Sequence, residues 1–135
     1  MSHSETAAIV LAAGLGTRME SELPKVLHAV AGRAMILQLL DSLSTIKPEK
    51  IVLVLGPEMD AVSEAVSEAG FTVETVIQQD RLGTGHAVRQ AESVLAGYTG
   101  NILVLYGDSP LITAETMADM LDARAGEDDP AVVVL

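Results

Sequence analysis

The sequence contains no cysteine, very few aromatic residues and few basic ones. Without cysteine, disulfide scaffolds, thiolate zinc sites and cysteine nucleophiles are excluded. One Phe, two Tyr and no Trp leave too little aromatic surface for a platform that stacks nucleic-acid bases. Eight Lys and Arg against nineteen Asp and Glu give a net charge of −11, which argues against general binding of nucleic acid or of an anionic membrane. Any polyanionic ligand must therefore meet a local cluster of positive charge.

The chain also lacks a long hydrophobic run and an export signal. Its longest apolar runs, such as residues 7–13, fall far short of the roughly 18 residues that span a membrane. The first residues, MSHSETAA, have neither the basic start nor the apolar stretch of a signal peptide. We therefore expect a cytoplasmic protein with no membrane or nucleic-acid partner. Its 135 residues, 49% of them hydrophobic, suffice for about one domain with its own core.

Continuous apolar runs, each about as long as one strand, recur along the chain. Residues 7–13, 51–55, 102–106 and 131–135 show no polar alternation, which is typical of strands covered on both faces in a parallel sheet. Residues 71–77 alternate more, which predicts a strand nearer the edge. Between these runs the apolar spacing becomes helical, and Thr113 is a predicted N-cap. The helical stripes are Ile36, Leu39, Leu40, Leu43 and Ile46; Met59, Val62, Val66 and Ala69; Ala87, Ala91, Val94 and Leu95; and Met117, Met120 and Leu121.

This alternation predicts an α/β fold: a Rossmann-like, doubly wound and mostly parallel sheet with right-handed crossovers. The run at 131–135 would be a further strand that no helix covers, and an uncovered apolar strand is unfavourable at the end of a domain. We therefore expect residues 1–135 to be the N-terminal, nucleotide-binding part of a larger domain. That fold would be incomplete at its C-terminus, and we expect no second domain within the chain.

The loop after the first predicted strand is rich in glycine and carries two cations. In open α/β sheets, ligands bind beyond the carboxyl ends of the strands. Gly14 and Gly16 follow the first run, but Met19 replaces the third glycine of a dinucleotide fingerprint, and no Walker A sequence is present. The loop amides can approach phosphate oxygens. Three of the eight basic residues lie close by in the sequence, and they form the expected positive cluster: Arg18, Lys25 and Arg33.

Two further loops carry polar groups suited to a nucleotide. Asp108 follows the run at 102–106, and Gly107 permits close backbone approach. A carboxylate beside phosphates can hold Mg²⁺, although an Asp that opens a turn before Pro110 is the simpler alternative. Gln78 offers the donor and the acceptor that a uracil edge requires. Taken alone, however, a Gln at a strand end is more often a surface residue.

Three motifs in order carry a family resemblance. They are L-x-x-G-x-G-T-R-M followed by P-K at 11–25, Q-x-x-x-L-G-T-G-H-A at 78–87 and Y-G-D-x-P-L at 106–111. Together they resemble the sugar-phosphate nucleotidyltransferases of the nucleotide-diphospho-sugar transferase fold, and within them the bacterial N-acetylglucosamine-1-phosphate uridylyltransferases. The order and approximate spacing agree over essentially the whole chain.

The resemblance implies that the protein transfers a uridylyl group from UTP to N-acetylglucosamine 1-phosphate. The products would be pyrophosphate and UDP-N-acetylglucosamine, a cell-wall precursor, and the cofactor would be Mg²⁺. Asp108 would be one metal ligand, and the family's second ligand, an Asn, would lie beyond residue 135. Arg18 and Lys25 would be catalytic. The nucleotide would contact Leu11, Ala12, Ala13, Gly14, Gly16, Thr17, Gln78, Gly83 and Thr84.

Two alternatives stay open. The chain could be a nucleotide-binding fragment without activity, because the family's sugar pocket and second metal ligand would follow residue 135. It could instead be a nucleotidyltransferase for another substrate, such as molybdopterin or a polyol phosphate, although the L-G-T-G-H-A segment argues against this. We expect UTP and a sugar 1-phosphate as partners. A homotrimer is expected only if a longer natural form carries the acetyltransferase half of the bifunctional relatives.

Overall fold

A computed structural model describes residues 5–14 and 22–135. Four parallel strands form one sheet in the order β5-β4-β1-β6, so β1 lies between β4 and β6. The strands are β1 (Thr6–Leu11), β4 (Lys50–Leu55), β5 (Glu74–Ile77) and β6 (Asn101–Tyr106). The helices are α1 (Met35–Thr45), α2 (Asp60–Glu68), α3 (Thr84–Arg89) and α4 (Ala114–Arg124). A 3-10 turn, η2 (Lys25–Leu27), precedes a small antiparallel hairpin of β2 (Ala29–Val30) and β3 (Arg33–Ala34).

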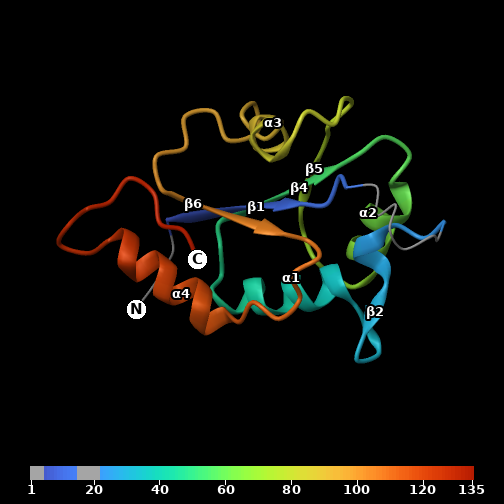
Figure 1. The fold of residues 1–135 in the computed structure, drawn as a ribbon, viewed down its shortest axis with the longest axis horizontal. Helices are drawn as coiled ribbons and strands as arrows, with labels where there is room; N and C mark the ends of the chain where they lie inside the picture. Colours follow the sequence, from blue (N-terminus) through green and yellow to red (C-terminus); the bar gives the residue numbers. More distant parts are fainter. Residues whose placement is uncertain (1–4, 15–21) are drawn as a thin grey trace.

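Helices cover both faces of the sheet (Figure 1). Every residue of β1 is buried, and alternate side chains enter different cores. Ala8 and Val10 pack with residues of α1, α2 and α4, whereas Ile9 and Leu11 pack with Ala87 of α3 and with residues that follow it. The predicted doubly wound, mostly parallel α/β fold is therefore confirmed. Among the described residues, no helix is long and apolar enough to cross a membrane.

The predicted helices are confirmed with one difference in length. Thr113 caps α4 as predicted, because its hydroxyl oxygen accepts a hydrogen bond from the Thr116 N–H at 3.1 Å. The stripe that runs to Leu95 is helical only as far as Arg89. Beyond that residue, the amides of Ala91 and Glu92 donate to carbonyls three residues back instead of four, so the helix gives way to turns. These turns still bury Ala91, so the predicted core stripe is correct although the helix is shorter.

The predicted strand at 131–135 is wrong. This run forms no strand, and Val132, Val134 and Leu135 are 75%, 84% and 74% exposed. A strand forms only where a neighbouring strand satisfies its backbone hydrogen bonds, and no described strand pairs with this run. The strands predicted at 7–13 and 71–77 are also shorter than expected, at Thr6–Leu11 and Glu74–Ile77, and β5 is an edge strand as predicted.

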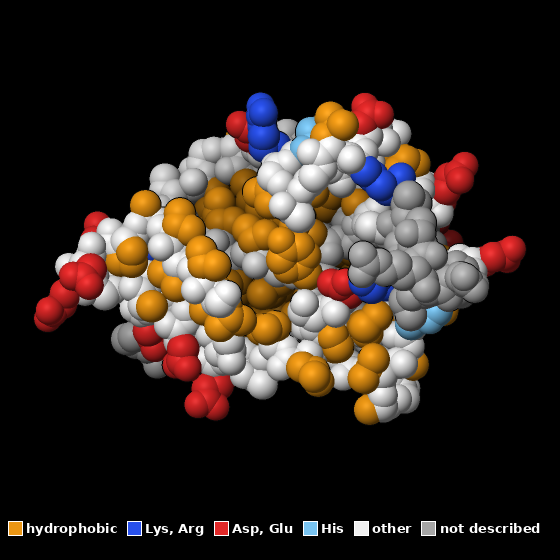
Figure 2. All heavy atoms as spheres, in the orientation of Figure 1, with side chains coloured by type: hydrophobic (Ala, Val, Ile, Leu, Met, Phe, Trp, Pro, Cys, Tyr) orange, Lys and Arg blue, Asp and Glu red, His pale blue; other side chains and the backbone are white. Residues whose placement is uncertain are grey.

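One face of β6 is exposed. Ile102, Val104 and Tyr106 are 47%, 39% and 49% exposed, because α3 covers the sheet over β1 and β4 rather than over this strand. Figure 2 shows hydrophobic side chains gathered in a hollow at this edge of the molecule, between α3 and α4.

Tyr98 is a half-buried tyrosine whose enclosed hydroxyl has no hydrogen-bond partner in the described part of the chain. Burial raises the pKa of Tyr98 above 10.0, and the carboxylates of Glu49 and Glu5 raise it further. A raised folded-state pKa contributes stability that is present below the unfolded pKa of about 10 and is lost as the pH rises through the folded value.

Tyr98→Phe is therefore expected to reduce the loss of stability above about pH 10. At neutral pH it should change the free energy of unfolding by less than about 1 kcal/mol, because the hydroxyl lacks a partner. Urea unfolding measured at neutral and at alkaline pH tests both statements. An equally steep alkaline loss in the variant would show that another group is responsible.

Candidate active site

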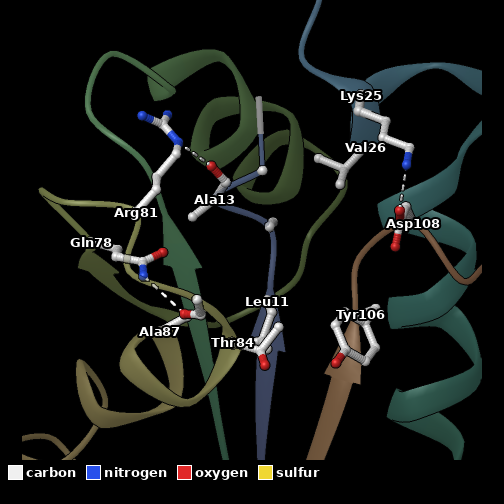
Figure 3. Close-up of a pocket in the computed structure, with 13 residues that line it drawn as sticks. Leu11, Ala13, Lys25, Val26, Gln78, Arg81, Thr84, Ala87, Tyr106 and Asp108 are labelled. Atoms are coloured by element: carbon white, nitrogen blue, oxygen red, sulfur yellow. Dashed lines mark hydrogen bonds and ion pairs between the residues drawn. The ribbon is translucent and has the colours of Figure 1, made fainter. Parts of the chain in front are cut away.

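A pocket of about 310 Å³ lies at the carboxyl ends of the parallel strands (Figure 3). It contains every predicted site residue that the structure describes. Gly16, Thr17 and Arg18 lie outside the described residues. The predicted residues that line the pocket are Leu11, Ala12, Ala13, Gly14, Lys25, Gln78, Gly83, Thr84 and Asp108, and Val26, Arg81, Ala87 and Tyr106 line it with them.

The end of β1 brings main chain into the pocket. The Ala12 N–H donates to the Val54 carbonyl at 2.9 Å, so the chain follows β4 for one residue beyond the strand. Ala12 and Ala13 are buried, whereas Gly14 is exposed, and no described residue other than its chain neighbours has an atom within 4 Å of where a Cβ would lie. The backbone therefore becomes exposed at Gly14, where a ligand in the pocket can reach it.

Gly107, at the end of β6, is closely surrounded by its neighbours. The Gly107 N–H donates to the Leu11 carbonyl at 2.9 Å. A Cβ at Gly107 would lie 3.0 Å from Cγ1 of Val26 and 3.3 Å from Cβ of Ala12. This close approach was expected from the sequence, and it seats η2 directly against the chain that leads to Asp108.

Lys25 and Asp108 form an ion pair in this pocket, with Nζ 2.7 Å from Oδ2 (Figure 3). The two side chains are 42% and 34% exposed, so the pair contributes little to stability. Its importance is positional, because buried Val26 anchors η2 and holds the ammonium over the carboxylate.

The ligands available around Asp108 suit a metal ion that is coordinated mainly by water and by substrate oxygens. The described residues contain no group of three or more His, Asp or Glu side chains placed to hold a metal ion. Mg²⁺ commonly uses one or two carboxylates together with water and substrate phosphates. Asp108, a single carboxylate in the lining of the pocket, fits this type of coordination.

Gln78 is buried at the opposite side of the pocket and is only 3% exposed. Its Nε2 donates to the Gly83 carbonyl at 3.3 Å and lies 2.9 Å from Nδ1 of His86. A carbonyl oxygen can only accept a hydrogen bond, so the atom of the Gln78 side chain that faces the Gly83 carbonyl is the amide nitrogen. Oε1 then points toward the pocket. Gly83 has φ 103°, which favours glycine, and it caps the start of α3.

The positive charge of the pocket differs from the predicted cluster. Arg33 does not line the pocket, because β3 places it against Asp41, with Nε 2.8 Å from Oδ2. Arg81 lines it instead, and its Nε donates to the Ala13 carbonyl at 2.8 Å. Sequence reasoning missed this role, although Arg81 is the one basic residue of the loop at 78–85.

Comparison with known protein families shows to which family the chain belongs. The model of the MobA-like NTP transferase domain matches residues 8–135. The chain belongs to this family. It is 55% identical to the bifunctional protein GlmU of Paramagnetospirillum magneticum over 100% of the chain, but over 29% of that relative. The chain thus spans under a third of the length of the curated relative, and the resemblance carried by the three motifs is confirmed.

Solved structures share the NTP transferase fold. HddC from Yersinia pseudotuberculosis, complexed with GMP-PN, superposes with a TM-score of 0.71 and 22% identity over 87% of this chain and 53% of that one. A Mycobacterium tuberculosis protein complexed with manganese gives a TM-score of 0.66 and 22% identity over 87% of this chain and 58% of that one. At these identities the likeness concerns the fold alone.

Proposed function

We propose that this chain is the N-terminal, nucleotide-binding part of a uridylyltransferase. The enzyme would transfer a uridylyl group from UTP to N-acetylglucosamine 1-phosphate, in the cytoplasm, for cell-wall precursor synthesis. The observation that carries the proposal is the convergence of three sequence-distant loops on one pocket. The similarity to a bifunctional GlmU supports the identity of the substrates. A homotrimer belongs to the proposal only for a form that includes an acetyltransferase half.

The proposed reaction needs positive charge rather than a general base. An oxygen of the sugar phosphate, already anionic near neutral pH, attacks the α-phosphorus of UTP. The bond from that phosphorus to the bridging oxygen breaks, and pyrophosphate leaves with the electron pair. Lys25, Arg18 and the amides around Gly14, Gly16 and Thr17 would offset charge on the phosphates and align the reactants.

Asp108 would hold Mg²⁺ in this scheme. When bound, the ion would neutralise charge on the triphosphate and the departing pyrophosphate. A structural relative is complexed with manganese, which supports the use of a divalent cation. Lys25, which pairs with Asp108 in this structure, would offset negative charge on the phosphates.

The base would be selected on the Gln78 side. Oε1 of Gln78 offers an acceptor to the N3–H of uracil, whereas cytosine presents an acceptor at that nitrogen. Main chain of Gly83 and of the segment Leu11–Gly14, together with Thr84, would complete the contacts. The side-chain amide of Gln78 would discriminate between UTP and CTP, because its nitrogen already donates to the Gly83 carbonyl and its oxygen is the group left to contact the base.

One experiment separates the alternatives. The 135-residue chain would be titrated with UTP, CTP and GTP in the presence of Mg²⁺, and UTP-dependent release of pyrophosphate would be measured with N-acetylglucosamine 1-phosphate. Preferential UTP binding with pyrophosphate release supports the proposal. UTP binding without release favours the nucleotide-binding fragment. Preference for CTP or GTP favours a transferase with another substrate, and absence of nucleotide binding refutes the proposal.

A further inference from the structure

Arg81 connects two loops that are far apart in the sequence. It lies in the loop after β5, and its Nε–H donates to the Ala13 carbonyl after β1, 68 residues away, at 2.8 Å. The guanidinium reaches Ala13 across the end of β4, where buried Gly56 leaves the necessary space. A Cβ at Gly56 would overlap Nη2 of Arg81 and would lie 3.1 Å from its Cζ.

The contact orients a peptide group that borders the pocket. No cis peptide bond is present among the described residues, and in a trans peptide the C=O and the following N–H point in opposite directions. By holding the Ala13 carbonyl, Arg81 therefore directs the Gly14 N–H away from itself. Figure 3 shows Lys25 and Asp108 on the far side of Ala13 from Arg81. Within residues 5–14 and 22–135, nothing accepts a hydrogen bond from this N–H.

We infer that Arg81 is a positioning residue, which holds the Ala13–Gly14 peptide so that the Gly14 N–H is presented to a phosphate group of the nucleotide. This inference rests on the proposed function. An N–H donor that is oriented before the ligand arrives costs no reorganisation on binding. Arg81 would act through its hydrogen bond to Ala13, and its charge would be secondary.

Two substitutions at Arg81 distinguish the effect of its hydrogen bond on UTP binding from the effects of its charge and its side-chain length. Gln places its Nε2 at the same point along the side chain as Nε of Arg, so Arg81→Gln retains a donor without the charge. Met has a carbon at that point, so Arg81→Met retains the length without a donor. Arg81→Met should weaken UTP binding about ten-fold, the equivalent of about 1.4 kcal/mol, and Arg81→Gln should recover most of that loss.

Gly56→Ala provides an independent test. Gly56 is outside the left-handed region, so alanine suits its backbone, and the new methyl group should displace the guanidinium. With Arg81 present, Gly56→Ala should weaken UTP binding in the same direction as Arg81→Met. In the Arg81→Met background Gly56→Ala should have a smaller effect, because the overlapping Arg81 atoms are gone and only Sδ of Met59, at 3.2 Å, stays close to the new methyl group. This dependence is a double-mutant coupling.

The measurement is a ¹⁵N–¹H NMR titration of the full 135-residue chain with UTP and, separately, with uridine. Arg81→Met should shift the Gly14 amide before ligand is added, reduce its response to UTP and weaken uridine binding by a smaller factor than UTP binding. Equal UTP affinity in Arg81→Met and wild type would overturn the inference. So would failure of Arg81→Gln to recover binding, or an equal loss of uridine affinity, which would indicate general damage to the loop.

The inference and the proposed function can fail separately. If the wild-type chain binds no UTP, the proposed function fails. The same titration is then performed with inorganic pyrophosphate. If pyrophosphate shifts the Gly14 amide and the shift depends on a hydrogen-bond donor at residue 81, the positioning role is supported. If the amide does not shift, or shifts equally in wild type and Arg81→Met, the positioning role is overturned.

Discussion

Lys25→Ala is expected to lower the turnover of UTP-dependent pyrophosphate release by about 10²-fold or more, because it removes a positive charge aimed at the phosphates in the transition state. Among the described residues that line the pocket, the basic ones are Lys25 and Arg81. The same substitution should strengthen the binding of Mn²⁺ alone to the chain, since Asp108 loses its ion-pair partner. Turnover and metal affinity are therefore expected to change in opposite directions.

The assay for Lys25→Ala is steady-state pyrophosphate release in a form of the protein that is active, accompanied by Mn²⁺ titration of the 135-residue chain. Lys50→Ala is a matched control, because Lys50 is also ion-paired, with Glu74 at 3.3 Å, and lies at the start of β4 away from the pocket. An active Lys25→Ala enzyme would exclude the proposed role.

Asp108→Asn is expected to reduce turnover by roughly 10²-fold or more, because several kcal/mol of metal-derived charge stabilisation are lost. Asn preserves the shape of the side chain but presents a neutral oxygen. Mn²⁺ binding to the chain should fall because the ligand is no longer charged. The fold should be retained, because the ion pair with Lys25 that is also lost is partly solvent-exposed and contributes little to stability. The spectroscopic signal of bound Mn²⁺ measures this loss directly.

Asp41→Asn is the control for Asp108→Asn, because Asp41 pairs with Arg33 outside the pocket. That variant should keep both metal affinity and turnover. If Asp108→Asn retained wild-type affinity for Mn²⁺, the carboxylate would not be a metal ligand, and the ion pair with Lys25 would be structural only.

Much of the architecture follows from local patterns in the chain. The continuous apolar runs that form β1 and β4 are explained by their position inside the sheet, where helices cover both faces. The run at 102–106 also forms a strand, β6, but the prediction that both of its faces are covered is wrong, because β6 lies at the edge of the sheet with one face exposed. The stripes of α1 and α2 follow equally from spacing. The run at 131–135 shows the limit of this reasoning, because apolar character favours burial but a strand also requires a hydrogen-bonding neighbour.

The location of the candidate site also follows from the sequence. Parallel strands end at one edge of their sheet, so the loops that begin at Gly14, Gln78 and Gly107 had to come near one another. The residue types of those loops, glycines with Lys25, Gln78 and Asp108, predict a site for phosphates, a base and a cation.

Only the tertiary structure decided which side chains touch within that site. Proximity in sequence suggested Arg33 as a third cation, but β3 turns it to Asp41, and Arg81 enters the pocket across Gly56. The pairing of Lys25 with Asp108 and the use of the Gln78 amide nitrogen by Gly83 were likewise invisible in the sequence. The reason is physical: residue type and period determine which elements form and where their ends meet, whereas individual contacts depend on side-chain reach across distant segments.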